Sequence, residues 1–175
     1  MKYPQVIIDG RIYKNFPQIE EKIYKRCQNL YNSQDNCIIH GDLCFSNILY
    51  SVESGVFKFI DPRGKWGQQN MAGDIKYDLT KLRHSIIGRY DFIINKLYSI
   101  EFQKNKINMS IFSGKIHEEI GNYFDEELKK HWDLNYIKLI EGLLFISMLP
   151  LHNDDLERQL AFFAVGIKRL NEVLK

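Results

Sequence analysis

Apolar residues near the start of this chain predict one helix followed by a small hairpin. After an apolar run at Val6 to Ile8 and a turn at Asp9-Gly10, the spacing becomes that of an amphipathic helix that starts just after Pro17. Its apolar positions are Ile19, Ile23, Cys27 and Leu30. Three short apolar runs follow, and the turn residues at 53–55 predict that the last two of them pair as a hairpin. These runs are Cys37 to His40, Ile48 to Ser51 and Val56 to Ile60.

From Asp74 onward the apolar residues recur every three or four positions, which predicts a helical body over residues 74–175. The first four of these apolar residues lie on one face of a predicted helix, which Gly88 would end or kink. These residues are Ile75, Leu79, Leu82 and Ile86. The pattern as a whole predicts an α+β fold that is mostly helical.

Polar residues indicate where the later helices begin. Asp133 is placed to cap a helix that ends near Pro150. Asp154 and Glu157 form a capping-box pattern ahead of the last helix. The acidic stretch at 118–127 could attract a cationic acceptor or simply form a solvated helix face.

Composition fits one domain over residues 1–175, with 45% hydrophobic and 26% charged residues. A net charge of +2 lacks the basic excess of a nucleic-acid binder. The three cysteines are an odd number without a C-x-x-C pair, which argues against a disulfide framework and a zinc site. No signal peptide is evident, and no stretch reaches the roughly 18 apolar residues needed to span a bilayer. We therefore expect a cytoplasmic protein with neither nucleic-acid nor membrane partners.

The stretch at 37–64 carries the candidate chemistry. His40, Asp42 and Asn47 match the pattern H-x-D-x-x-x-x-N between two predicted strands. Alone, this three-residue match is a weak signal, because chance produces it readily. The apolar run that follows ends in Asp61, with Gly64 three residues later.

A third segment, GDIKYDLTKL, then opens a helix with Asp74 and Asp78. This order of segments resembles the catalytic loop, metal-binding strand and following helix of the aminoglycoside and choline kinase family of phosphotransferases. The resemblance covers about a quarter of the chain. It implies the carboxy-terminal lobe of a protein-kinase-like fold, with a small catalytic β-hairpin and a helical body.

The resemblance implies an ATP- and Mg²⁺-dependent kinase that phosphorylates a hydroxyl of a sugar, amino alcohol or aminoglycoside-like acceptor. Asp42 would be the catalytic residue that orients this hydroxyl and takes its proton. Asn47 and Asp61 would be the metal ligands, since amide and carboxylate oxygens suit Mg²⁺. We expect the strands before and after the loop to pair, which would bring Asp42 and Asp61 to one cleft.

Two of the remaining candidates have supporting roles in the family. His40 would pack and hydrogen-bond beneath the loop, and Asp78 would hold the loop backbone, although Asp74 or Asp78 could instead be a plain N-cap. Arg63 could contact a phosphate or an acidic substrate group, or form a surface ion pair. Trp66 could line a substrate cleft or simply pack.

We expect the amino-terminal lobe that such kinases use to cover the nucleotide to be absent or vestigial in this sequence. Only 39 residues precede His40, and residues 1–16, a remnant of that lobe or a linker, offer at most a strand pair. No glycine-rich loop or strand lysine is recognisable there. A partner chain or a longer protein could supply the lobe. Two alternatives stay open, namely a non-catalytic kinase-like module for binding or scaffolding and a helical domain with a chance motif.

Overall fold

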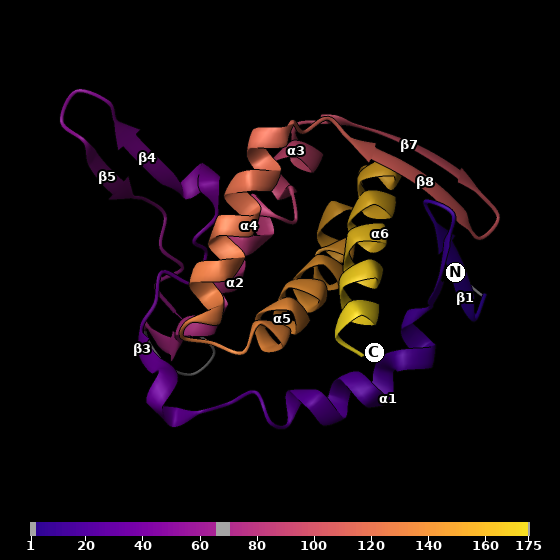
Figure 1. Ribbon diagram of the computed structural model, residues 1–175, viewed down its shortest axis with the longest axis horizontal. Coiled ribbons are helices and arrows are strands. Elements are labelled where there is room, and N and C mark those ends of the chain that lie inside the picture. The colour runs from indigo at the N-terminus through magenta and orange to yellow at the C-terminus, as the bar shows by residue number, and fades with distance from the viewer. Residues whose placement is uncertain (1–2, 66–70, 175) are drawn as a thin grey trace.

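A four-stranded sheet joins two hairpins that are far apart in the sequence (Figure 1). The computed structural model describes residues 3–65 and 71–174. The sheet order is β2-β1-β8-β7, with β1 and β8 parallel and the other pairs antiparallel. Val6, Ile8 and Ile107 are fully buried where the sheet packs on the last helix. The strands are β1 (Gln5–Ile8), β2 (Arg11–Lys14), β7 (Tyr98–Gln103) and β8 (Lys106–Ile111).

The hairpin β7–β8 corrects the prediction that the chain is helical from Asp74 onward. In this hairpin, residues that face inward alternate with exposed residues. This alternation with a period of two is typical of a half-buried strand. Lys104 adopts a left-handed φ of 56° at the turn between the strands. The inward residues are Tyr98, Ile100, Ile107, Met109 and Ile111. The broader expectation is confirmed, because the fold is α+β with about 51% helix and 20% strand.

The helical body is built around two helices that cross at very short range. Helix α5 packs along α6, and a Cβ on Gly142 would lie 2.8 Å from Leu170 of α6. Glycine at the crossing therefore permits a backbone approach that a larger residue would block. Helix α1 lies beneath the C-terminal end of α6 (Figure 1), and its Ile19 and Ile23 are buried against α5 and α6. The helices are α1 (Phe16–Cys27), α2 (Ile75–Ile86), α3 (Tyr90–Ile94), α4 (Lys115–Lys129), α5 (Leu134–Ser147) and α6 (Leu156–Val173).

Several predicted helix boundaries are confirmed, but the first helix begins at Phe16, before Pro17 rather than after it, and ends at Cys27, before Leu30. The Asp133 side chain caps α5 by accepting from the Asn135 N–H at 2.8 Å. Gly88 follows the end of α2. The predicted N-cap of the last helix is wrong by one residue. Asp155, not Asp154, accepts the hydrogen bond of the first turn, from the Arg158 N–H at 3.0 Å. Two adjacent aspartates satisfy the same local pattern, and only the path of the chain selects between them.

Four short strands frame the candidate loop. The predicted hairpin is confirmed as β4 with β5. The expectation that the strands before and after the loop pair is wrong, because β3 pairs with β6. Since β6 leads directly into α2, this pairing places the start of α2 beside the loop. The strands are β3 (Asn36–Ile38), β4 (Ile48–Ser51), β5 (Val56–Phe59) and β6 (Ala72–Asp74).

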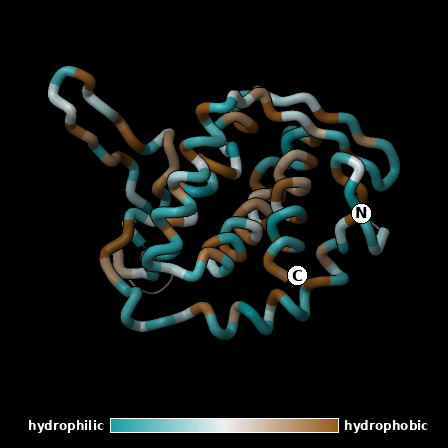
Figure 2. Tube along the Cα trace, in the orientation of Figure 1, coloured by the Kyte–Doolittle hydropathy of each residue, from teal (hydrophilic) through white to brown (hydrophobic). Residues whose placement is uncertain are grey.

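The β4–β5 hairpin projects from the body (Figure 1), and several of its residues are hydrophobic, coloured brown along the tube in Figure 2. An isolated two-stranded hairpin is marginally stable in water, so exposed apolar side chains on such a hairpin favour contact with another surface. This apolar hairpin consists of the exposed residues Leu49, Tyr50, Val52, Val56, Phe57 and Phe59.

One helical stretch, Leu134–His152, is long and apolar enough by length and composition to cross a bilayer, contrary to the expectation that no stretch is. It comprises α5 and the following turn. Within the fold this stretch packs against α6 and α2 and carries the fully buried Glu141. Such packing is typical of a core helix, so the stretch is weak support for a membrane span.

A buried charge network joins α2, α4, α5 and α6. The Arg83 guanidinium, 1% exposed, forms a two-pronged pair with Asp125 at 2.8 and 2.9 Å. It also pairs with Glu141, which is fully buried and lies 3.0 Å from Arg169 Nε. Buried charges of this kind are costly when one partner is removed.

We expect Arg83→Met to lower the free energy of unfolding by about 3 to 5 kcal/mol, because it leaves Asp125 and Glu141 without their shared cation. Urea unfolding followed by circular dichroism measures this change. Adding Glu141→Leu should recover part of the loss, since the buried Glu141 carboxylate, which then has only Arg169 as its cation, is removed. Lys25→Met, which breaks an exposed pair with Glu21, is the control and should leave the midpoint unchanged. A midpoint for Arg83→Met equal to that of the control would contradict the network's role.

Candidate functional site

The loop at residues 40–42 is fastened to α2 by one carboxylate. Asp78, 4% exposed, accepts from the backbone N–H of His40 at 2.6 Å and of Gly41 at 2.9 Å. The N-cap of α2 is Asp74, which accepts from the Lys76 N–H at 2.9 Å. The two aspartates of the GDIKYDLTKL segment thus have different tasks. Asp74 starts the helix, and Asp78 satisfies two donors of the loop.

Gly41 turns the loop at a position that excludes a side chain. Its φ is 77°, in the left-handed region that favours glycine. A Cβ at this position would also lie 2.9 Å from the Cβ of Arg63. The close approach is reinforced by the Arg63 N–H, which donates to the His40 carbonyl at 2.9 Å. The loop and the segment after β5 are therefore held against each other.

The His40 ring forms hydrogen bonds both with the loop and with the segment after β5. Its Nδ1 accepts from the Asp42 N–H at 3.3 Å, and its Nε2 lies 2.9 Å from the Ile60 carbonyl oxygen. Because Nδ1 is an acceptor, the proton resides on Nε2, which donates to that carbonyl. The ring also meets Phe59 edge to face, with centroids 6.5 Å apart. These contacts orient the loop and leave no ring nitrogen for a substrate.

Asp42 and Asn47 are in direct contact at the centre of the site. The Asn47 Nδ2 donates to the Asp42 carbonyl at 2.9 Å and approaches Asp42 Oδ2 at 3.3 Å. The other carboxylate oxygen of Asp42 lies 2.7 Å from Lys81 Nζ. The Asp42 side chain is 35% exposed, so it is both held and accessible.

Asp61 lies on backbone that is bonded to the same loop. The residue before it, Ile60, donates its N–H to the Asn47 carbonyl at 3.0 Å and accepts from His40. Asp61 itself adopts a left-handed φ of 56°, an uncommon conformation that aspartate tolerates better than most residues. Unusual backbone of this kind concentrates at functional positions. Within residues 3–65 and 71–174, the exposed Asp61 carboxylate has no hydrogen bond or ion pair.

Two oxygen groups of the site are of the chemical kind that Mg²⁺ takes when it is shared with phosphates. Asn47 uses its amide nitrogen for both bonds to Asp42, so its Oδ1 is left as an acceptor with no partner among the described residues. This oxygen and the Asp61 carboxylate are hard ligands, and Mg²⁺ often takes only one or two protein groups besides water and phosphate. In the part of the chain that the structure describes, no group of three His, Cys, Asp or Glu side chains could hold a metal alone.

Arg63 and Trp66 were weaker candidates. The exposed Arg63 guanidinium lies over the ring of Tyr77, 5.8 Å from its centroid. It therefore sits at the junction of the loop and α2, next to the candidate site. Trp66 lies outside the described residues. The acidic stretch at 118–127 is largely engaged in ion pairs with Arg83, Lys129 and Lys130.

Two site residues were missed by the sequence analysis, Lys81 and Ser85. Ser85 Oγ accepts from the Phe45 N–H at 3.1 Å, and Lys81 pairs with Asp42. Both follow Asp78 at helical spacing, three and seven residues later, so all three share one face of α2. That spacing was the available signal.

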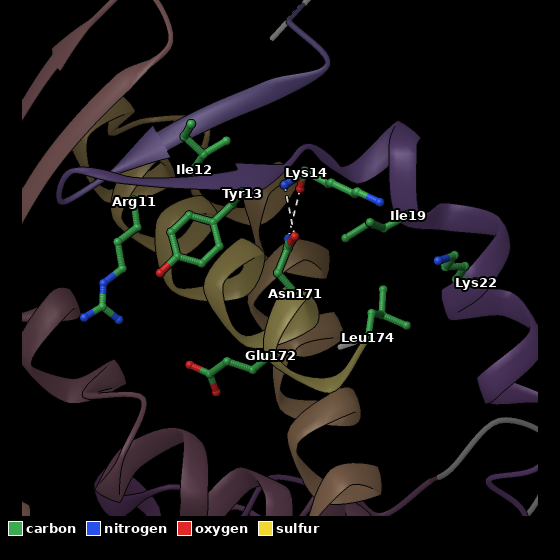
Figure 3. A pocket seen from close by; sticks show the side chains of 9 residues that line it. All are labelled: Arg11, Ile12, Tyr13, Lys14, Ile19, Lys22, Asn171, Glu172 and Leu174. Carbon is green, nitrogen blue, oxygen red and sulfur yellow. Dashed lines mark hydrogen bonds between the residues drawn. The ribbon is translucent and has the colours of Figure 1, made fainter.

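A separate pocket of about 470 Å³ lies between β2, α1 and the end of α6 (Figure 3). Asn171 closes one side by bonding both the N–H and the carbonyl of Lys14, at 3.0 and 2.9 Å. Arg11 and Lys22 add positive charge to its rim. The pocket contains no residue of the loop or of β4–β5, so it is distinct from the candidate site.

No family model, curated protein or solved structure matches this chain.

Proposed function

We propose that this chain is the carboxy-terminal lobe of an ATP- and Mg²⁺-dependent phosphotransferase that acts on a hydroxyl of a small molecule. The observation that carries the proposal is the junction of Asp42, Asn47 and Asp61. Asn47 touches Asp42, and Asp61 follows a residue bonded to both Asn47 and His40. Phosphoryl transfer needs this kind of fixed positioning more than it needs covalent chemistry.

The residues divide the work by their contacts. Asp42, partly exposed and held at both oxygens, orients the acceptor hydroxyl and takes its proton. The free oxygens of Asn47 and Asp61 would hold Mg²⁺, which would supply positive charge to neutralise the phosphates. The supports, His40 and Asp78, fix the loop that carries Asp42.

The apolar hairpin supports a role for a partner chain or a further lobe of the protein. It begins directly after Asn47 and ends directly before Ile60 and Asp61, so anything that covers it also borders the metal ligands. A nucleotide-covering lobe supplied in this way would complete the enzyme. The same surface also favours the second candidate function, a non-catalytic kinase-like module that binds a protein partner.

The acceptor class in this proposal is a sugar, an amino alcohol or an aminoglycoside-like molecule, and the location is the cytoplasm. The location rests on the cysteines, because Cys27, Cys37 and Cys44 are all free. Unpaired thiols, one of them exposed, suit a reducing compartment.

Calorimetry should find weak binding of ATP to the isolated chain, with a Kd on the order of 1 mM, and only when Mg²⁺ is present. The reason is that the described residues include the proposed metal ligands, whereas the adenine pocket of such kinases is expected mainly from an amino-terminal lobe. Tight binding without magnesium would place the nucleotide at another site.

The proposed activity is tested by offering sugars, amino alcohols and aminoglycosides with ATP and Mg²⁺ and detecting a phosphorylated product by mass spectrometry. The screen is run with the chain alone and with candidate partner proteins. Product that requires the chain and Mg²⁺ supports the phosphotransferase. Absence of product under every condition makes the non-catalytic module the better description.

A further inference from the structure

Helix α2 presents three polar side chains to the candidate loop from one face. Asp78 and Ser85 bind backbone N–H groups of the loop, as described above. Lys81, between them on the same face, instead contacts a loop side chain, the Asp42 carboxylate. One rigid helix therefore fixes both the path of the loop and the direction of its acidic group.

Lys81 is a buried cation directed at one atom. The residue is 8% exposed, and its Nζ lies 2.7 Å from Asp42 Oδ1. Its ammonium group also lies 5.6 Å from the centroid of the Tyr90 ring, close enough for a cation–π contact. Tyr90 in turn stacks on His84, with centroids 4.5 Å apart. The stacked rings of Tyr90 and His84 therefore lie beside the lysine side chain that reaches Asp42.

The two aromatic neighbours of Lys81, Tyr90 and His84, are uncharged. Burial raises the pKa of Tyr90 to about 12, so its phenol stays protonated. Burial, assisted by the charge of Lys81, lowers the pKa of His84 well below its usual value. Asp42 is therefore the counter-ion of Lys81, and the pair is not shared with these two side chains.

We propose that Lys81 is a positioning residue that holds the Asp42 carboxylate in the orientation that receives the proton of the acceptor hydroxyl. The inference rests on the proposed phosphotransferase function. Lys81 holds Oδ1 while Asn47 approaches Oδ2 at 3.3 Å, so rotation of the carboxylate is restricted from both sides. Each carboxylate oxygen has a further lone pair, so a carboxylate held in this way still accepts the hydroxyl proton.

Lys81→Met tests the role, because methionine keeps most of the buried stem and removes the charge. We expect kcat to fall about 10-fold to 100-fold, the scale of a misplaced catalytic group. The KM for MgATP should change by less than about threefold, since the metal ligands are untouched. Lys81→Arg, which restores the cation, should recover most of the lost kcat.

Lys76→Met is the matched control. Lys76 is also a buried lysine of α2, 4% exposed, and it pairs with Asp35 and with Asp74 at 2.9 Å, away from Asp42. This variant carries the same chemical change on the same helix and should keep its kcat. A loss of stability common to both variants is thereby separated from the loss specific to Lys81.

A double variant distinguishes action through Asp42 from direct action on the phosphates. In the Asp42→Asn background, Lys81→Met should change kcat by less than about twofold, because the group that it positions is already disabled. If the two substitutions lower kcat by the product of their separate effects in the double variant, the positioning role is wrong. It is also wrong if the kcat of Lys81→Met equals that of Lys76→Met. In both cases the proposed function stands. If the wild-type chain transfers no phosphoryl group in the screen, the proposed function fails and this inference fails with it.

Discussion

Magnesium-dependent turnover should be lost when Asp61 is replaced by alanine, because the only carboxylate proposed to hold the metal is then gone. Treating the wild-type protein with EDTA should give the same loss, reversed by added Mg²⁺. The rate of product formation at saturating ATP is the measurement. Retained turnover in Asp61→Ala would remove Asp61 from the metal site.

Asp61→Asn sharpens this experiment. Alanine at a φ of 56° adds strain of about 1 kcal/mol or more, whereas asparagine tolerates the left-handed conformation and loses only the charge. Asp9→Asn is the matched control, since Asp9 also has a left-handed φ, 48°, and lies in the turn between β1 and β2. Turnover should fall in Asp61→Asn and persist in Asp9→Asn.

Replacing Asp42 with asparagine should lower turnover by about 10²-fold to 10⁴-fold, the range for losing a positioned general base. Asparagine has the same shape and keeps an oxygen near Lys81, so the fold should persist. Single-turnover rates and circular dichroism of the same samples separate the chemical step from stability.

The control for Asp42 is a second aspartate that pairs with a buried lysine of α2. Asp35 pairs with Lys76 as Asp42 pairs with Lys81. Asp35→Asn should therefore keep its turnover. Equal losses in the two variants would mean that Asp42 acts only through the stability of the fold.

Local patterns located most of the elements. The spacing of apolar residues predicted α1, α5 and α6, and turn residues predicted the β4–β5 hairpin. The β7–β8 hairpin was missed because its apolar residues were absorbed into an expected helical body, although Tyr98, Ile100 and the residues of β8 alternate with a period of two. In this segment the period of two of the strands competes with the helical period.

The burial of α2 was harder to anticipate. Its apolar stripe predicted a core face, yet of Ile75, Leu79, Leu82 and Ile86 only Ile86 is buried. The helix buries mainly polar residues. Some of them contact the loop, and Arg83 belongs to the buried charge network. Hydropathy cannot indicate this, because a polar side chain is buried only when a specific partner from elsewhere in the chain satisfies it.

The sequence by itself determined which loop residues form the candidate site, because His40, Asp42 and Asn47 lie in one short loop and Asp61 follows the next hairpin. Tertiary structure decided how those residues are held. The pairing of β3 with β6 and the contacts of Asp78, Lys81 and Ser85 with the loop all join residues about 35 to 40 positions apart. The parallel pairing of β1 with β8 joins residues about 100 positions apart. Local periodicity reports only neighbours along the chain, whereas such contacts depend on which surfaces pack together once the loops between them have closed.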